Sequence, residues 1–308
     1  MRYLLLYLKG MLMGAADLVP GVSGGTIALI TGIYKELLES INSFSLATLK
    51  IGKQEGLKSV WKKLNGHFLL AVFGGILSSI LLFSRLLEWL IESHPLILWS
   101  FFFGLLVASI IYLFKQELPF NLRTLLYVLF GAVSSFLITQ LNGGENQSSL
   151  WYLFLSGFIG ISAMILPGLS GAYLLVIMGV YQTILSNVRI AQDLMVNFDQ
   201  NQFIDTASIL GVFLLGIGLG IKVFAKFLSW LLDRYPERSI AVLVGLMLGA
   251  LHKVWPWQNA DVASIKQTVA VLPQHFEGDP QLLTALLWMS LGFGILFFIE
   301  RIKIGASK

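Results

Sequence analysis

The chain has 308 residues, of which 56% are hydrophobic and only 12% are charged. This balance excludes an ordinary soluble domain and predicts a helical protein that crosses the membrane several times, since apolar segments of about 20 residues recur. The net charge of +4 does not indicate a nucleic-acid partner, because the basic residues flank apolar segments, where they set topology and contact anionic headgroups. The lack of cysteine excludes disulfides and thiolate chemistry.

The N-terminal segment, Met1 to Ala16, has a basic residue at its start, an apolar run and small residues at its end, as a secretory signal peptide does. However, Lys9 interrupts the apolar run, and the segment has a counterpart before Pro167. We therefore expect it to be retained as the first arm of a helical hairpin.

Two short stretches interrupt apolar runs with a Pro-Gly pair that is followed by small residues: Pro20-Gly21-Val22-Ser23-Gly24-Gly25-Thr26 and Pro167-Gly168-Leu169-Ser170-Gly171-Ala172-Tyr173. Pro-Gly breaks a helix, and small residues let the backbone approach another group closely. Ser23 and Ser170 stand at or beside the start of the next helix, where free N–H groups favour an anion. Such breaks at matching places in two halves point to the binding site of a transporter.

The chain contains an internal repeat. Residues 161–188 align with residues 14–41 without a gap and are identical at nine of 28 positions, including the Pro, Gly and Ser of the two stretches. Residues 210–250 align in the same way with residues 69–109, and the matches include Gly and Trp. Apolar composition alone would not match these residue types in order, so the membrane unit is predicted to be duplicated.

We expect a single membrane domain, residues 1–308, made of repeat units at about 1–145 and about 146–308. The predicted segments are a broken hairpin at 3–40, spans at 68–91, 96–114 and 122–141, a second hairpin at 150–187, and spans at 207–232, 238–254 and 282–300. Each hairpin, whether spanning or re-entrant, returns to its starting side, so three further spans invert the second unit. The fold class is therefore an all-α polytopic membrane protein with two inverted-topology repeats.

The basic residues give an independent prediction of topology. With the N-terminus in the cytoplasm, fifteen of the 21 Lys and Arg residues lie inside, three lie within spans and three lie outside. Those outside are Arg189, Lys253 and Lys266. We therefore expect both termini to be cytoplasmic.

Ionisable residues within spans are costly and indicate function. Arg85 and Glu88 lie three apart on one helical face and are placed to pair, while Lys226 is the repeat counterpart of Arg85 and Lys222 lies one turn earlier. We expect one phosphate-binding site, formed by Ser23, Gly24, Gly25, Thr26, Ser170, Gly171, Arg85, Lys226 and Lys222. The alternative is that the cations extend to a membrane interface.

Asp17 lies three residues before Pro20, and Met164 takes its place in the second unit. A lone acid beside a broken helix is a candidate for coupling to H⁺ or Na⁺, as is Glu88 within its span. Asp17 is equally suited to cap the following helix or to pair with a lysine, and both interpretations stay open. The four histidines are scattered without metal-ligand spacing, so neither a metal nor a cofactor is expected.

The run Met13-Gly14-Ala15-Ala16-Asp17-Leu18-Val19-Pro20-Gly21-Val22-Ser23-Gly24-Gly25-Thr26, with Gly32-Ile33-Tyr34 after it, resembles the signature of the bacterial polyprenyl-phosphate transporter family called PopT. The resemblance covers essentially the full length, including the second PGLSG copy. It implies transport of undecaprenyl phosphate across the bacterial cytoplasmic membrane, to recycle the lipid carrier of peptidoglycan and other envelope glycans. The partners would be this lipid, membrane lipids and a coupling H⁺ or Na⁺, and a homodimer stays open.

Two other functions are alternatives. Undecaprenyl-pyrophosphate phosphatases also have inverted repeats and a PGxSRSG segment, but Gly24 and Gly171 stand where that segment has its Arg. No E-x-x-x-E pair lies directly before either stretch. A transporter of a small soluble anion would need a closed polar site. We predict a lipid transporter that is not an enzyme, in which one unit rocks against the other and the phosphate moves from outside to inside.

Overall fold

The structure is a computed structural model that describes residues 2–18, 23–45, 48, 50, 54–141, 149–260 and 268–306. The side chains at 84, 85, 88, 92, 260 and 297–306 lie outside this description, as do Pro20, Gly21 and Val22 of the first break. The described residues are mostly helical, as the sequence predicts.

The first unit begins with a broken hairpin of three helices, α1 (Arg2–Asp17), α2 (Gly24–Ile30) and α3 (Tyr34–Ser43), here named hairpin one. Ser23 is the N-cap of α2, and Gly32 ends it with a φ of +72°, a conformation that glycine adopts without strain. The hairpin therefore has a second break that the sequence analysis did not predict. The unit continues with α5 (Leu57–Lys63), α6 (Gly66–Ser93), α7 (Pro95–Glu117) and α8 (Leu122–Gln140).

The second unit repeats this order. Hairpin two consists of α9 (Leu150–Ile165), α10 (Gly171–Ile177) and α11 (Tyr181–Asp193), and α10 and α11 meet at 109° after Gly179, whose φ is +69°. Next come α12 (Gln200–Arg234), α13 (Pro236–Ala250) and the short 3-10 helix η1 (Leu251–Val254). An antiparallel ribbon of β1 (Gln258–Ala260) and β2 (Thr268–Ala270), the 3-10 helix η2 (Pro273–His275) and α14 (Leu282–Ala306) complete the chain.

Among the described residues, four helices are long and apolar enough to cross a membrane: α6, α7, α8 and α12. The bent pair of α10 and α11 would add a fifth. The protein is therefore a multi-pass helical membrane protein, as predicted. The predicted span at 238–254 is shorter than expected, because α13 ends at Ala250 and the chain continues as η1.

Close helix crossings occur at equivalent positions of the two units. Where α1 crosses α6, a Cβ added to Gly10 or to Gly75 would lie 2.1 Å from a carbonyl oxygen of the other helix. Where α9 crosses α12, the repeat counterparts Gly157 and Gly216 would meet carbonyl oxygens at 2.4 Å and 2.1 Å. Only glycine fits at these four positions, as in other small-residue helix pairs of membranes.

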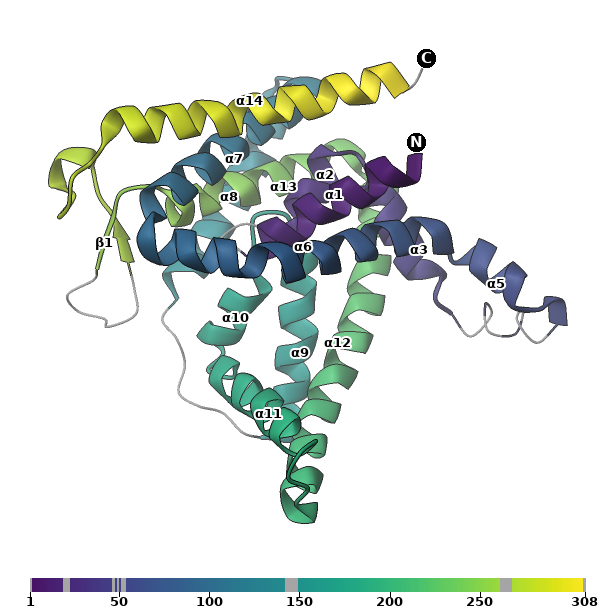
Figure 1. Cartoon of the computed structure of the whole chain (residues 1–308). Coiled ribbons are helices and arrows are strands. Elements are labelled where there is room, and N and C mark those ends of the chain that lie inside the picture. Colours follow the sequence, from purple (N-terminus) through teal and green to yellow (C-terminus); the bar gives the residue numbers. More distant parts are fainter. Residues whose placement is uncertain are drawn as a thin grey trace.

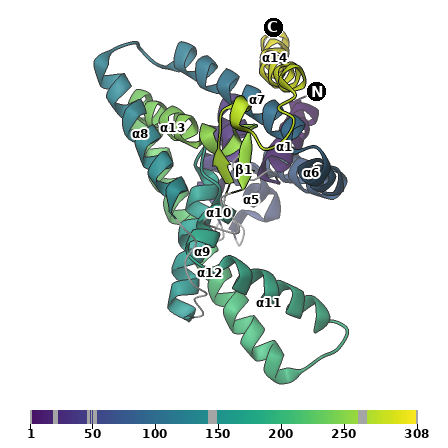
Figure 2. The ribbon, with the colours of Figure 1, turned by 90° about the vertical axis from the view of Figure 1, so that its left-hand side faces the viewer.

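The two units exchange their later helices. α7 of the first unit packs against α14 of the second, and α13 of the second packs against α8 of the first, so the helices lie side by side in Figures 1 and 2. Gly104 of α7 and its counterpart Gly245 of α13 lie at these crossings. These two helix pairs therefore connect the two halves of the chain.

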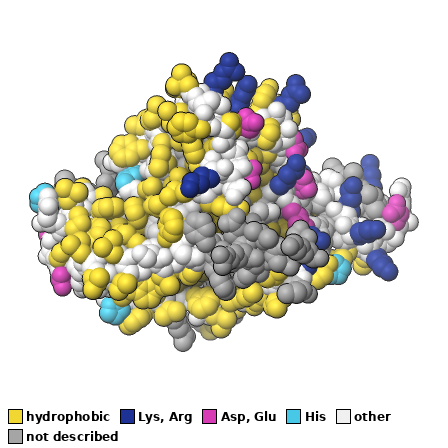
Figure 3. All heavy atoms as spheres, turned by 90° about the horizontal axis from the view of Figure 1, so that it is seen from above, with side chains coloured by type: hydrophobic (Ala, Val, Ile, Leu, Met, Phe, Trp, Pro, Cys, Tyr) yellow, Lys and Arg dark blue, Asp and Glu magenta, His cyan; other side chains and the backbone are white. Residues whose placement is uncertain are grey.

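Apolar side chains remain exposed along α6, α8 and α12. Figure 3 shows hydrophobic side chains over much of one face, with Lys and Arg side chains gathered toward one side. Such an extended apolar surface is expected where helices face lipid.

One ion pair within hairpin one and one between this hairpin and α12 lie at the end of the molecule where the N-terminus lies (Figure 1). Arg2 pairs with Glu36 at 2.8 Å, and Lys35 of α3 pairs with Asp233 near the end of α12 at 2.6 Å. The basic helix α5 projects on the same side (Figure 1). This concentration of basic groups is where the topology prediction places the cytoplasm.

Candidate functional site

The two hairpins contact each other where each is broken. The hydroxyl of Ser23 donates to the carbonyl of Met164 at 3.1 Å, and the hydroxyl of Tyr34 donates to the carbonyl of Ile165 at 2.9 Å. A Cβ added to Gly25 would lie 2.5 Å from the same Ile165 oxygen. Hairpin one therefore binds the last carbonyl groups of α9 directly.

Backbone geometry at Gly168 completes this contact. Its N–H donates to Oγ1 of Thr26 at 3.2 Å, and its φ is +81°. An added Cβ would lie 2.7 Å from backbone atoms of Leu246 and Met247 in α13. A glycine is thus required both by the left-handed conformation and by the close approach of α13.

Hairpin one has already used the donors at the start of α2. Oδ1 of Asp17 accepts from Gly24 N–H at 2.7 Å, and Oγ of Ser23 accepts from Gly25 N–H at 3.1 Å. The N–H of Thr26 donates to the Ser23 carbonyl at 2.9 Å. Of the two interpretations left open for Asp17, the structure shows helix capping, and a carboxylate of the chain itself occupies the place expected for phosphate.

Hairpin two leaves the equivalent donors available. Ser170 is the N-cap of α10, but its Oγ is 3.4 Å from Tyr173 N. The N–H groups of Gly171 and Ala172 have no acceptor among the described residues. Met164, at the position equivalent to Asp17, has no carboxylate to offer them. The two breaks therefore differ in chemistry although they share a sequence.

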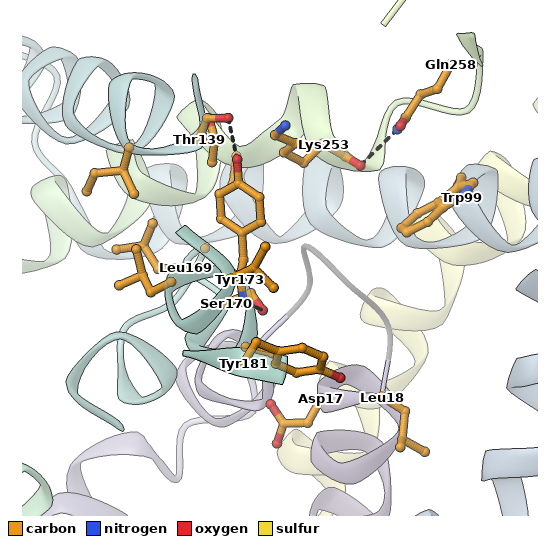
Figure 4. A pocket seen from close by; sticks show the side chains of 16 residues that line it. Asp17, Leu18, Trp99, Thr139, Leu169, Ser170, Tyr173, Tyr181, Lys253 and Gln258 are labelled. Carbon is orange, nitrogen blue, oxygen red and sulfur yellow. Dashed lines mark hydrogen bonds between the residues drawn. The ribbon is translucent and has the colours of Figure 1, made fainter. Parts of the chain in front are cut away.

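A cavity of about 560 Å³ lies against hairpin two, and we name it the Lys253 cavity. Ser170, Tyr173 and Tyr181 line it from hairpin two, Asp17 from hairpin one, and Lys253 from η1 (Figure 4). Its other lining is mainly apolar. It thus combines one cation, one carboxylate, hydroxyl groups and a wall suited to hydrocarbon.

Lys253 is held over the cavity by its neighbours. Its Nζ lies 5.2 Å from the centre of the Tyr173 ring, and its carbonyl accepts from the side-chain amide of Gln258 at 2.9 Å. The Tyr173 hydroxyl in turn donates to the carbonyl of Thr139 in α8 at 2.7 Å (Figure 4). The cation therefore belongs to a bonded framework of α8, α10 and η1.

The sequence analysis missed Lys253 because it assigned this residue to an outside loop. One signal could have indicated it: Lys253 directly follows the apolar run of a predicted span and precedes Trp255-Pro256-Trp257. Among the cavity-lining residues that the structure describes, Lys253 is the only Lys or Arg.

The structure does not bring Lys222 and Lys226 to this cavity. Nζ of Lys222 donates to the carbonyl oxygens of Asn42, at 2.6 Å, and Phe44, just beyond α3. With Lys226 it lines a different cavity at the end of α12. Arg85 and Glu88 lie on α6, and their side chains fall outside the described part, so their predicted pairing stays a prediction.

The residues that were expected at one phosphate site thus lie in different places. Ser23, Gly25 and Thr26 form the contact between hairpins, and Gly24 binds Asp17 within hairpin one. Ser170 faces the cavity instead. No cluster of three or more His, Asp or Glu side chains that could hold a metal ion occurs within the described ranges.

Comparison with known proteins finds one family model and two relatives with related names. Residues 13–271 match the sequence model of a family described as undecaprenyl phosphate translocase-like. A polyprenyl-phosphate transporter of Vibrio cholerae serotype O1 is 44% identical over 259 residues, which cover 84% of this chain and 80% of the relative. A polyprenyl-phosphate transporter of Staphylococcus aureus is 30% identical over 264 residues, which cover 81% of this chain and 85% of the relative. No solved structure matches.

Proposed function

The chain belongs to the undecaprenyl phosphate translocase-like family, and from this premise we propose that it transports polyprenyl phosphate across a membrane. The names of the family and of both relatives are those of transporters, so the protein is a transporter and not an enzyme. The finer proposal is that the cargo is undecaprenyl phosphate, returned from the outer to the inner leaflet of a bacterial cytoplasmic membrane for reuse as a carrier.

The observation that carries the proposal is Lys253, set in a largely apolar cavity beside the broken start of α10. The phosphate would pair with the Lys253 ammonium and accept from the Ser170 hydroxyl and the N–H groups of Gly171 and Ala172. Charge-assisted bonds of this kind are short and strong where water is scarce. The isoprenoid chain would leave along the apolar wall toward the lipid.

Asp17 controls whether hairpin one can bind an anion. While its carboxylate holds Gly24 N–H, the start of α2 cannot bind a second anion. Phosphate binding by Gly24, Gly25 and Thr26 would require Asp17 to leave, either by protonation or by exchange with a cation. This requirement supports Asp17 as the coupling residue for H⁺ or Na⁺, and Glu88 stays a second candidate.

Alternating access fits the repeat. The paired glycine crossings of α1 with α6 and of α9 with α12 support two duplicated units. In our proposal these units have inverted topology and rock against each other. In the opposite state the roles of the hairpins would exchange, and Arg85 and Lys226 would then be the counterions nearest hairpin one.

The test uses the purified protein in liposomes that contain polyprenyl phosphate, and it measures how fast the headgroup becomes accessible from the other side. We expect transport by the unmodified protein and by Lys58→Ala on the exposed helix α5, and at least tenfold slower transport by Lys253→Ala. A parallel measurement follows inorganic phosphate. Liposomes in which the unmodified protein moves only inorganic phosphate, or nothing, would refute a lipid transporter.

A further inference from the structure

A second cavity, of about 600 Å³, lies at the C-terminal end of α12, and we name it the α12 cavity. Lys222, Lys226, Trp230 and Arg234 all line it and are spaced four residues apart. Residues at this spacing lie on one face of a helix. The cavity wall is therefore a stripe of three cations and one tryptophan.

Two of the charged groups in this wall are already engaged. The Lys222 ammonium binds the carbonyl oxygens of Asn42 and Phe44. Asp233 pairs with Lys35. Lys222 keeps its charge but has committed donors to these oxygens, and Lys35 neutralises the Asp233 carboxylate. The other cations of the cavity remain available to a ligand.

Lys226 and Arg234 are the cations that remain available. Neither has an acidic or hydrogen-bonding partner among the residues that the structure describes. These two cations lie eight residues apart on one face, beside the exposed Trp230, and both are free to bind a ligand. An anion with two charges would neutralise both.

An apolar cavity of about 680 Å³ adjoins this cationic wall. The two cavities share Ser45 and Lys222, so they are continuous at that point. Phe44, Leu69 and Phe73 are among the side chains that line the apolar cavity, between the end of α3, the start of α6 and the middle of α12. A charged end thus opens into one hydrocarbon-lined groove.

From this arrangement we propose that polyprenyl phosphate has a second binding site here, with its phosphate between Lys226 and Arg234 and the start of its chain in the apolar groove. A phosphate monoester carries close to two negative charges and three free oxygens at neutral pH, which suits two unpaired cations. A phosphodiester lipid has one charge and two chains, for which the site offers one cation too many and one groove too few. The proposal rests on the proposed function, since it concerns the same cargo.

The location gives this second site a role. The α12 cavity lies at the end where Lys35 pairs with Asp233 and where the N-terminus and α5 gather basic groups. The Lys253 cavity is lined by α8, α10 and η1 instead. One site would therefore serve each leaflet: the Lys253 cavity receives the lipid and the α12 cavity releases it.

The experiment counts lipids bound to the full-length protein by native mass spectrometry, with polyprenyl phosphate, the uncharged polyprenol and phosphatidylglycerol as separate probes. We expect two polyprenyl phosphates on the unmodified protein and one on the double variant Lys226→Ala with Arg234→Ala. The single variant Lys226→Arg, which keeps the positive charge, should still bind two. The double variant Lys58→Ala with Lys62→Ala, which removes two cations from α5, should still bind two.

Loss of one bound polyprenyl phosphate in Lys253→Ala, and of both in the triple variant, would support two distinct sites. Two lipids on the Lys226/Arg234 double variant would overturn the second site while leaving the transport function intact. Equal binding of phosphatidylglycerol, lost in that variant, would also overturn it, since the occupant would be a phospholipid. A failed transport function would be recognised separately, by unmodified protein that binds no polyprenyl phosphate and moves none in liposomes.

Discussion

Hairpin one and hairpin two share the sequence Pro-Gly-x-Ser-Gly, yet the N–H groups that follow it have different hydrogen-bond partners. In hairpin one the first N–H of α2 donates to Asp17, and Ser23 contacts the carbonyl of Met164. In hairpin two the first N–H groups of α10 have no acceptor among the described residues, and Ser170 faces a cavity that also contains Lys253. One hairpin is closed on itself and on its partner, and the other is open to a ligand.

The difference arises where the repeats diverge rather than where they agree. Asp17 is replaced by Met164, and Thr26, which accepts from Gly168, is replaced by Tyr173, whose hydroxyl binds α8. Shared residues build the same break twice, and the unshared ones decide which break can bind an anion. A structural repeat therefore need not be a functional repeat in any one conformation.

The largest effect is expected where an added side chain would clash at the contact between the hairpins. Gly25→Ala would place a Cβ 2.5 Å from the Ile165 oxygen, and Gly168→Ala would add left-handed strain to a clash with α13. We expect each to lower the free energy of unfolding by about 3 kcal/mol or more. The measurement is thermal unfolding in detergent.

The matched control is Gly218→Ala in α12, where an added Cβ has nothing within 4 Å. Alanine is the better helix former, so this change should be neutral or stabilising by up to about 1 kcal/mol. Equal unfolding temperatures for Gly25→Ala and Gly218→Ala would show that the hairpins are not in close contact.

The second-largest effect is expected at Lys253, the cation that faces hairpin two. Lys253→Ala should weaken polyprenyl phosphate binding about 10- to 100-fold, the value expected for a lost bond of about 1.5–3 kcal/mol to a charged group. Lys253→Arg should retain most of the affinity, because the charge remains. Binding that is unchanged in Lys253→Ala would remove this residue from the site.

The third effect exchanges the residues that distinguish the hairpins. Met164→Asp should supply hairpin two with the carboxylate that closes hairpin one, and so weaken phosphate binding about tenfold by competition and repulsion. Asp17→Asn should do the reverse and tighten binding a few-fold, because it removes a negative charge from the lining of the Lys253 cavity. The amide oxygen can still accept from Gly24 N–H, so hairpin one should stay closed. Titration of each purified variant with polyprenyl phosphate measures both changes, and shifts in the opposite directions would refute the comparison.

The smallest effect compares two tyrosines at equivalent positions. Tyr34→Phe removes the bond to the Ile165 carbonyl and should cost about 1 kcal/mol of stability. Tyr181→Phe should leave stability unchanged, because its hydroxyl has no hydrogen-bond partner among the described residues and lines the cavity instead (Figure 4). Unfolding in detergent again measures both, and a larger loss for Tyr181→Phe would contradict the assignment.

Much of the fold could be predicted from the sequence, because hydrophobic length and helix-breaking residues are local signals. The predicted span at 68–91 corresponds to α6 (Gly66–Ser93), and the second break lies at Pro167, as expected. The turns at Gly32 and Gly179 were missed although both glycines are shared by the repeats, since a lone glycine in an apolar run indicates a packing contact as readily as a turn.

The candidate site was predicted less completely, because it depends on distances between units. Ser170 could be identified from its break, and it lies in the cavity. Lys226 was placed with it by repeat symmetry, but α12 carries Lys226 to a separate cavity. The position of Lys253 at the end of an apolar run marks it as a candidate, but no local pattern indicates that this residue, about eighty positions after Ser170, folds back onto the same hairpin.

The central claim is that hairpin two, and not hairpin one, holds the phosphate in this conformation. The most direct measurement is an experimental structure of the protein with bound polyprenyl phosphate. The account predicts phosphate density within hydrogen-bonding distance of Ser170 and Lys253, with Asp17 still bound to Gly24 N–H. Density at Gly24 and Gly25, with Asp17 displaced and the Lys253 cavity empty, would contradict it.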